Sequence, residues 1–219
     1  MPERIAILDF ETTGMSPAHG ARAAEVGIVM VEDGRIVDRY QSLMNAGQYM
    51  PSFITQLTGI TTAMVQAAPP ASAVMREAAD FVGSAPLVAH NASFDSKFWQ
   101  DELERAGCPL MQPIATLFTC SVLLSRRLYP EAPSHSLGRI VRHLQLPPAD
   151  KAHRALADAE MTAHLLLRMQ TDLRQRWHIP QPDSPLLNSL QRCPKKQLPR
   201  MLQDTSRLQS QPALPELSN

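Results

Sequence analysis

The first part of the chain alternates hydrophobic and polar residues in the manner of strands. The run RIAILDF is apolar and β-branched and is bounded by the turn-like TTG, which predicts a buried central strand. Two further β-rich runs lie on either side of Asp33-Gly34, and an Asp-Gly pair in that position indicates a hairpin turn. We therefore expect three consecutive strands at the start of the fold.

Beyond Pro51 the apolar spacing becomes helical, and helices then alternate with short strands. AVMREAADFVG is an amphipathic segment that ends at glycine, and SFDSKFWQDELERAG repeats this pattern. PLVAH between them predicts a fourth strand, and IATLFTC a fifth that continues as a helix. Two later segments, SLGRIVRHLQL and AHRALADAEMTAHLLLRMQTDLRQRW, predict helices. This order indicates an α/β fold, a mixed five-stranded sheet with helices on both faces.

The pattern changes after Trp177. Residues 178–219, which we call the C-terminal segment, are rich in proline, glutamine and serine, contain no glycine and have no sustained hydrophobic period. We therefore expect one domain over residues 1–177 and a largely irregular C-terminal segment. Its scattered leucines could form a short docking helix.

Composition narrows the class of protein. A chain of 219 residues with 44% hydrophobic residues is ordinary for a globular protein, and no apolar run approaches the roughly 20 residues that span a bilayer. The N-terminus has no signal-peptide pattern, and the three cysteines have no metal-site spacing. We therefore expect a cytoplasmic protein that binds no membrane.

The net charge of zero conceals an uneven distribution. Residues 1–173 carry 14 Lys and Arg against 18 Asp and Glu, whereas residues 174–219 carry 7 against 3. A protein that holds a long duplex by charge is usually more basic than residues 1–173. A polyanionic substrate would therefore be drawn by local features, by metal ions or by the C-terminal segment.

Four acidic residues lie near predicted strand ends or on the long helix. Asp9 and Glu11 are two apart at the end of the first strand, so that both side chains lie on one face. Asp95 follows the fourth strand in HNASFD, and Asp158 lies in HRALADAE. Neighbouring carboxylates repel one another unless a cation lies between them. Oxygen ligands favour Mg²⁺ or Mn²⁺ over zinc.

The histidine of HRALADAE suits proton transfer at such a metal site. Five residues separate His153 from Asp158, which is a poor spacing for a direct hydrogen bond on a helix. Two ions about 3.5 to 4 Å apart can stabilise the attacking and leaving oxygens of a displacement at phosphorus. The imidazole of His153 could then accept a proton from the attacking water near neutral pH.

Three motifs resemble those of the DEDDh exonuclease superfamily. They are D-F-E-T-T-G at 9–14, H-N-A-S-F-D at 90–95 and H-R-A-L-A-D-A at 153–159, in the order typical of that family. Shorter similarities are A-E-V-G at 24–27, L-T-G-I-T at 57–61 and S-H-S-L at 134–137, so the resemblance covers about residues 3–173. The most similar branch is the proofreading epsilon subunit of bacterial DNA polymerase III.

The resemblance implies a ribonuclease-H-like fold and removal of nucleoside 5′-monophosphates from a 3′ end with two Mg²⁺ or Mn²⁺ ions. It makes Asp9, Glu11, Asp95 and Asp158 the metal ligands and His153 the general base. The substrate-binding residues that we expect are Thr12, Thr13, Met15, Asn91 and Phe94. For three of these an alternative stays open, because Met15 could simply pack, Asn91 could hold the loop before Asp95, and Phe94 could belong to the core. The chain departs from the family pattern at Thr119-Cys120, where relatives commonly have Asp-Thr.

Several functional alternatives follow from the same residues. The leading hypothesis is an exonuclease on single-stranded or frayed 3′ ends of DNA, in proofreading or repair. RNA 3′-end trimming or degradation of oligoribonucleotides is an alternative within the enzyme class. A catalytically silent module that binds nucleic acid or a polymerase is disfavoured, because a scaffold has no need of clustered acids. A polymerase or a sliding clamp is a possible partner, the latter through Gln197–Leu202, and the oligomeric state is open.

Overall fold

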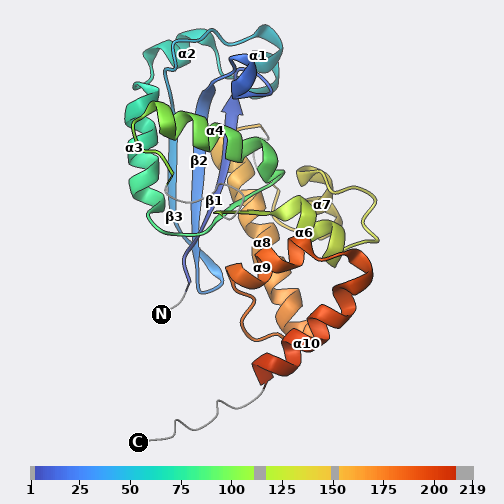
Figure 1. The fold of residues 1–219 in the computed structure, drawn as a ribbon. Helices are drawn as coiled ribbons and strands as arrows, with labels where there is room; N and C mark the ends of the chain where they lie inside the picture. The colour runs from blue at the N-terminus through green and yellow to red at the C-terminus, as the bar shows by residue number, and fades with distance from the viewer. Residues whose placement is uncertain (1–2, 111–116, 149–152, 211–219) are drawn as a thin grey trace, which may run out of the picture.

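The computed structural model describes residues 3–110, 117–148 and 153–210 (Figure 1). Its sheet has five strands in the order β3-β2-β1-β4-β5. In chain order these are β1 (Ile5–Thr12), β2 (Ala23–Glu32), β3 (Arg35–Leu43), β4 (Leu87–Ala89) and β5 (Phe118–Cys120).

The sheet is mixed, as the sequence predicts. β1, β2 and β3 pair antiparallel, whereas β4 pairs parallel with both β1 and β5. The predicted hairpin between β2 and β3 turns at Asp33 and Gly34, whose φ values are 51° and 75°. Because β1, β4 and β5 run in the same direction, their carboxyl ends meet at one edge of the sheet, which we call the carboxyl edge.

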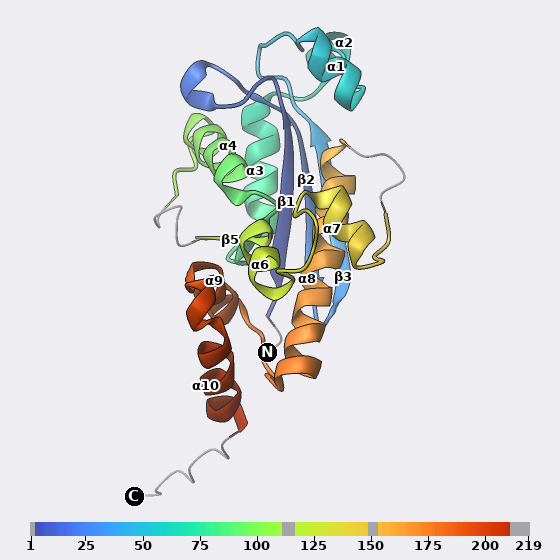
Figure 2. The same cartoon turned by 90° about the vertical axis from the view of Figure 1, so that its right-hand side faces the viewer.

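Helices cover both faces of the sheet (Figures 1 and 2). α3 and α4 lie on one face, and the long helix α8 lies on the other. The helices that precede β5 in the chain are η1 (Pro17–His19), α1 (Ser52–Thr58), α2 (Thr62–Ala67), α3 (Ala71–Val82) and α4 (Ala92–Arg105). The helices that follow β5 are α6 (Ser121–Leu128), α7 (Leu137–His143), α8 (Ala155–Trp177), α9 (Ser184–Arg192), η2 (Lys195–Gln197) and α10 (Leu198–Ser210).

Alternation along β1 divides the core into two layers. Ala6, Leu8 and Phe10 pack with residues of α3 and α4. Ile5 and Ile7 pack on the other face with residues of α8. Asp9 and Glu11 continue this second series, so that the two carboxylates lie on the α8 face of the sheet.

The prediction of a largely irregular C-terminal segment is wrong for its described part. α9, η2 and α10 occupy most of residues 184–210, and α9 and α10 bury leucines in the same core layer as α8. The sequence concealed these helices because proline and glutamine dominate the segment, while its leucine spacing is helical only over short stretches. Leu198 and Leu202 are among the buried side chains. Gln197–Leu202 is therefore not an exposed peptide of the kind that docks on a clamp.

The C-terminal segment also covers the open edge of the sheet. Gln191 of α9 accepts a hydrogen bond from the backbone nitrogen of Cys120 at 2.7 Å and donates one to the carbonyl of Phe118 at 3.0 Å. Its side-chain amide thus takes the place of a neighbouring strand beside β5. Covering an edge in this way satisfies backbone groups that would otherwise be buried without partners.

Within the described ranges, no helix combines the length and the apolar character that crossing a bilayer requires.

Candidate active site

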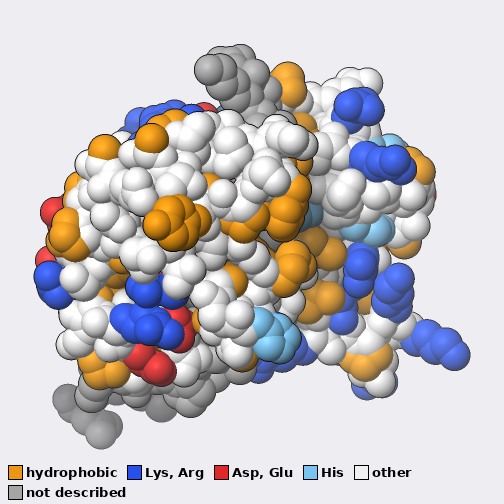
Figure 3. All heavy atoms as spheres, turned by 90° about the horizontal axis from the view of Figure 1, so that it is seen from above, with side chains coloured by type: hydrophobic (Ala, Val, Ile, Leu, Met, Phe, Trp, Pro, Cys, Tyr) orange, Lys and Arg blue, Asp and Glu red, His pale blue; other side chains and the backbone are white. Residues whose placement is uncertain are grey.

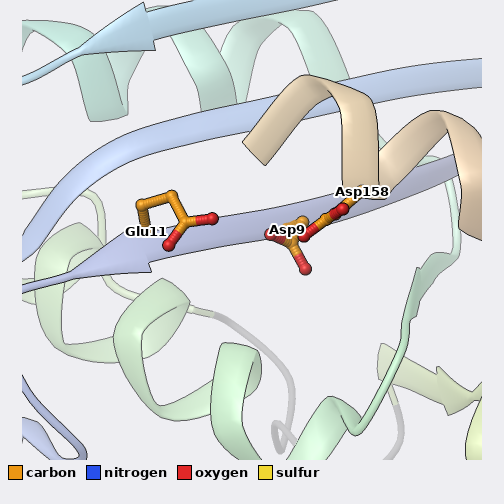
Figure 4. A group of neighbouring side chains, drawn as sticks. All are labelled: Asp9, Glu11 and Asp158. Carbon is orange, nitrogen blue, oxygen red and sulfur yellow. The ribbon is translucent and has the colours of Figure 1, made fainter. Parts of the chain in front are cut away.

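Three of the four predicted acidic residues converge at the carboxyl edge. Asp9 and Glu11 on β1 and Asp158 on α8 each place a carboxylate oxygen within 4.8 Å of the others (Figure 4). All three side chains are half-buried. Three carboxylates at this separation supply the hard oxygen donors that Mg²⁺ and Mn²⁺ prefer, so the donor set fits such an ion.

Asp95 lies next to this group and is more deeply buried. It is in the first turn of α4 and is 2% exposed. Its Oδ1 accepts a hydrogen bond from the backbone nitrogen of Phe10, the residue between Asp9 and Glu11, at 3.2 Å. This contact ties the start of α4 to β1 and holds the Asp95 carboxylate beside the other acids.

Burial and mutual repulsion raise the pKa values of these acids. Burial is the largest cause for Asp9, followed by the charges of Asp95 and Asp158, and its pKa is well above the usual range. Burial, Asp158 and Glu25 raise the pKa of Glu11 to about 7, against the opposing charge of Arg154. Burial raises the pKa of Asp95 to about 8, although the Phe10 hydrogen bond lowers it. Acids shifted in this direction are poised to bind a cation, because its charge removes the repulsion.

A second set of contacts holds Asp158 in place. Glu25 on β2 is fully buried and pairs with the guanidinium of Arg154 through both carboxylate oxygens, with Nε at 3.1 Å. The same carboxylate accepts a hydrogen bond from the backbone nitrogen of Ala155 at 3.1 Å. Glu25 thus satisfies a free N–H at the first turn of α8, where a negative charge is also favoured by the helix dipole.

Gly27 allows α8 to approach β2 closely. A Cβ atom at this position would overlap the backbone of Leu156 and the carbonyl carbon of Ala155. The first turn of α8 therefore lies directly on the backbone of β2. The sequence offered a signal for both positioning residues in A-E-V-G at 24–27, but their roles require the tertiary contact with α8.

His153 lies outside the helix, directly before its N-cap residue Arg154. Its backbone is left-handed, with φ of 63°, and its side chain is exposed. Burial raises the pKa of Asp158, whereas the imidazole of His153 and a hydrogen bond from the His153 backbone lower it. The two residues are therefore neighbours at the carboxyl edge, with His153 on the solvent side.

The turn after β1 places Met15 in solvent. The hydroxyl of Thr12 donates to the carbonyl of Gly14 at 2.7 Å, and the hydroxyl of Thr13 accepts from the nitrogen of Arg22 at 2.9 Å. The backbone nitrogen of Thr13 donates to the carbonyl of Arg22, so this N–H is already engaged within the turn. Met15 is 80% exposed, which excludes the alternative that it simply packs in the core.

Asn91 and Phe94 support the segment that carries Asp95. Asn91 is the N-cap of α4 in a left-handed conformation, with φ of 70°, and its carbonyl accepts a hydrogen bond from the nitrogen of Phe94. The ring centroids of Phe94 and Phe98 lie 5.0 Å apart, and Phe94 is partly buried against the core. Both residues are thus engaged in local structure, as the alternative interpretation of each predicted.

Three exposed apolar side chains near this end of the molecule were not singled out from the sequence. Tyr49 precedes α1, and Phe53 and Leu57 lie four residues apart on that helix. Their exposed fractions are 75%, 64% and 52%. Figure 3 looks onto the end where α1 and η1 lie, and hydrophobic side chains are visible across it. Only tertiary structure separates such residues from buried ones of the same type.

His90 has a structural role. It follows β4, and its Nδ1 lies 2.9 Å from the hydroxyl of Ser121 while its Nε2 lies 3.0 Å from the carbonyl of His135. Burial lowers its pKa to about 4, so the ring is neutral at physiological pH. At the departure from the family pattern, Thr119 is buried in β5, and Cys120 is held by Gln191.

Comparison with known sequences identifies one family. A sequence model of the family described as exonuclease (RNase_T) matches residues 6–166. The chain is 37% identical over 177 residues to the 3′-5′ exonuclease DinG of Bacillus subtilis, covering 79% of this chain and 18% of that protein. It is 34% identical over 180 residues to the PolC-type DNA polymerase III of the same organism, covering 80% and 12%. The chain therefore spans less than a fifth of the length of these curated relatives.

Solved structures confirm the predicted ribonuclease-H-like fold. Exonuclease X in complex with 5′ overhanging duplex DNA is 26% identical, with a TM-score of 0.66, and the match covers 85% of this chain and 99% of that one. The nuclease domain of 3′hExo, a DEDDh family member bound to rAMP, is 22% identical with a TM-score of 0.65, covering 78% and 93%. This second likeness concerns the fold alone.

Proposed function

Since the chain belongs to the exonuclease family, we propose that it hydrolyses the terminal phosphodiester bond at the 3′ end of a nucleic-acid strand and releases nucleoside 5′-monophosphates. The observation that carries the proposal is the convergence of Asp9, Glu11 and Asp158 within 4.8 Å beside the buried Asp95. These acids come from β1, α4 and α8, and no single element could bring them together.

We assign the acids to metal binding. Asp9, Glu11 and Asp158 would hold a divalent cation, Mg²⁺ or Mn²⁺, and Asp95 would complete the ligands for a second. Such ions supply positive charge to the attacking and leaving oxygens of an in-line displacement. His153 accepts the proton of the attacking water, because its exposed imidazole lies beside Asp158 and an imidazole nitrogen can accept a proton from water.

Further residues position the acids and the segments around them. Glu25 and Gly27 fix the first turn of α8, which sets the place of Asp158 relative to β1. Thr12 and Thr13 shape the turn that presents Met15, and Asn91 and Phe94 shape the start of α4. We propose that these residues meet or support the terminal nucleotide.

We favour DNA with a single-stranded or frayed 3′ end as the substrate. Exposed apolar and aromatic side chains, here Met15, Tyr49, Phe53 and Leu57, suit stacking on unpaired bases without sequence preference. The likeness to DinG and to PolC-type polymerases also favours DNA. RNA trimming or oligoribonucleotide degradation is the second candidate, since the solved relative bound to rAMP shares the fold.

The direct test is release of mononucleotides from 3′-labelled strands of DNA and of RNA, single-stranded or with mismatched 3′ ends. We expect Mg²⁺ or Mn²⁺ to support the reaction, EDTA to abolish it, and DNA to be the better substrate. No metal-dependent loss of label on either polymer would leave the silent binding module as the better hypothesis.

The wider context is a matter of proposal as well. The likeness to part of PolC-type polymerases suggests a role in proofreading or repair beside a polymerase, in the cytoplasm. The burial of Leu198 and Leu202 gives no support to docking on a clamp through Gln197–Leu202. Co-purification with a replicative polymerase would test the first of these associations.

A further inference from the structure

A group of basic side chains beside the site is not used by the hydrolysis described above. Arg126 lies in the last turn of α6, His143 in the last turn of α7, and Lys195 and Lys196 lie in η2. We call these four exposed residues the basic surface. Within the described ranges, Arg126 and both lysines form no ion pair, whereas many other arginines of the chain are paired with acids.

Two parts of the basic surface, the end of α6 and η2, are held next to one another. Arg127 donates from Nε to the carbonyl of Cys193 at 2.8 Å, which fixes the end of α6 against the residues that lead into η2. His135 lies among these charges: burial lowers its pKa, Arg126 and Lys195 lower it further, and Glu131 opposes them. Figure 3 shows lysine, arginine and histidine side chains along the right of this face, on the side where α6, α7 and the C-terminal helices lie.

The basic surface adjoins the carboxyl edge of the sheet. His90 directly follows β4 at that edge, and its ring contacts both Ser121, the first residue of α6, and the carbonyl of His135. The imidazole of His135 in turn lies 3.0 Å from the hydroxyl of Ser125 on α6. A continuous path of contacts therefore leads from the loop before Asp95 to the helix that carries Arg126.

The charge of the candidate active site creates a need for such a surface. Three carboxylates converge at the carboxyl edge beside the buried Asp95, and residues 1–173 as a whole have four more acids than Lys and Arg. This distribution repels every phosphate of a strand that no metal neutralises. The C-terminal residues 174–219 have four more Lys and Arg than acids, and they provide two of the four basic residues.

We propose that the basic surface binds the phosphate backbone of the substrate strand on the 5′ side of the terminal nucleotide. The proposal rests on the function proposed above: when the 3′ end occupies the site, all remaining nucleotides lie on its 5′ side. Lys and Arg contact phosphates without reading sequence, which suits an enzyme that removes one nucleotide after another. The C-terminal helices then serve substrate binding as well as stability.

The test compares a long substrate with one that has no upstream phosphates. The long substrate is a 3′-labelled single strand of about 20 nucleotides, enough to reach beyond the site. The short one is the p-nitrophenyl ester of thymidine 5′-monophosphate, whose hydrolysis reports on the catalytic residues alone. The variant is Arg126→Gln with Lys195→Gln, in the full chain. We expect its kcat/KM on the long strand to fall relative to kcat/KM on the ester.

Salt dependence gives the expected size of the effect. Each phosphate contact to a single strand contributes about 0.7 to the slope of log affinity against log salt. Loss of two contacts should lower the slope for the long strand by about 1.4. A rise from about 50 to about 200 mM salt should therefore reduce the affinity of the parent protein for the long strand about sevenfold more than the affinity of the variant.

The matched control removes two exposed arginines from the end of the sheet opposite the carboxyl edge. Arg4 directly precedes β1 and Arg35 begins β3, and Arg4→Gln with Arg35→Gln should leave both the ratio of the two kcat/KM values and the salt slope unchanged. An unchanged ratio and slope in the Arg126/Lys195 variant would overturn the proposal. If the parent protein hydrolyses neither substrate with Mg²⁺ or Mn²⁺, the proposed function itself fails. The two failures are therefore distinguishable.

Discussion

The carboxylate of Glu25 binds the guanidinium of Arg154 through two hydrogen bonds, at a point where β2 meets the start of α8. The same carboxylate accepts the backbone N–H of Ala155. Asp158 lies one turn further along this helix, so the geometry of the acidic cluster depends on a buried charge that is not itself part of it.

Glu25→Gln should therefore lower both stability and activity. The amide offers only one accepting oxygen, so it cannot serve Arg154 and Ala155 as the carboxylate does. We expect a loss of about 2 kcal/mol in the free energy of unfolding, measured by urea denaturation. Arg39→Gln is the control, because Arg39 also links the sheet to α8, through Glu160, but in an exposed pair. Its cost should stay below about 1 kcal/mol, and equal costs would contradict the special role of Glu25.

Gly27→Ala should displace the first turn of α8. Its methyl group would overlap the backbone of Leu156, which cannot yield as a flexible side chain does. We expect a loss of about 1 to 3 kcal/mol in stability and a large drop in kcat, since Asp158 moves with the helix. The control is Gly138→Ala on α7, where an added Cβ meets no atom within 4 Å. That change should be neutral or stabilising by up to about 1 kcal/mol.

His153→Ala and Asp158→Ala should separate proton transfer from metal binding. Loss of a general base lowers kcat by about 10² to 10⁴-fold, whereas the Mg²⁺ concentration for half-maximal activity should hardly change. Asp158→Ala should damage both quantities. His164→Ala, which changes a histidine within α8, provides the control and should leave kcat near that of the parent. Equal effects of the first two changes on metal affinity would refute the division of roles.

Metal-free protein should lose stability as the pH rises. Burial and neighbouring acids raise the folded-state pKa values of Asp9 and Glu11, that of Glu11 to about 7, and burial raises the pKa of Asp158. The folded state then binds more protons than the unfolded chain, so the free energy of unfolding falls as these groups ionise, between about pH 5 and pH 8. We expect the Tm in EDTA to fall over this range and Mg²⁺ to restore it at the upper end.

Glu11→Gln tests the same loss of stability by removing one of the acids that ionise. It removes a carboxylate whose pKa is raised, so it should increase the Tm of metal-free protein at about pH 8 while it abolishes metal-dependent activity. Glu32→Gln, at the far end of β2, should change neither. A lower Tm for Glu11→Gln in EDTA would show that the acids do not repel one another in the folded state.

Gln191→Ala should reveal whether the C-terminal helices belong to the same folding unit. It leaves the buried N–H of Cys120 and the carbonyl of Phe118 without partners, at about 1 to 3 kcal/mol for each group. Gln209 bonds the backbone of Gln181 in the same two-fold manner, but on the surface. Gln209→Ala should therefore change the free energy of unfolding by less than about 0.5 kcal/mol.

Local patterns in the sequence determined much of the fold and the identity of the candidate residues. Period-2 alternation in β1 fixed that Asp9 and Glu11 share a face, and the helical period after Arg154 placed Asp158 on a helix. The motifs around His90 and His153 then identified the family. These inferences succeed because each depends on neighbours within a few residues along the chain.

Tertiary structure alone decided how these residues meet. The 4.8 Å cluster requires α8 to close on β2, which depends on Glu25 and Gly27, more than 100 residues earlier in the chain. The helices of the C-terminal segment were missed because its many proline and glutamine residues interrupt the hydrophobic period, and these helices form by packing against the core layer of α8. Lys195 and Arg126 likewise share one surface only because segments far apart in the chain pack together. The sequence by itself specifies which chemical groups are present, whereas long-range burial decides which of them become neighbours.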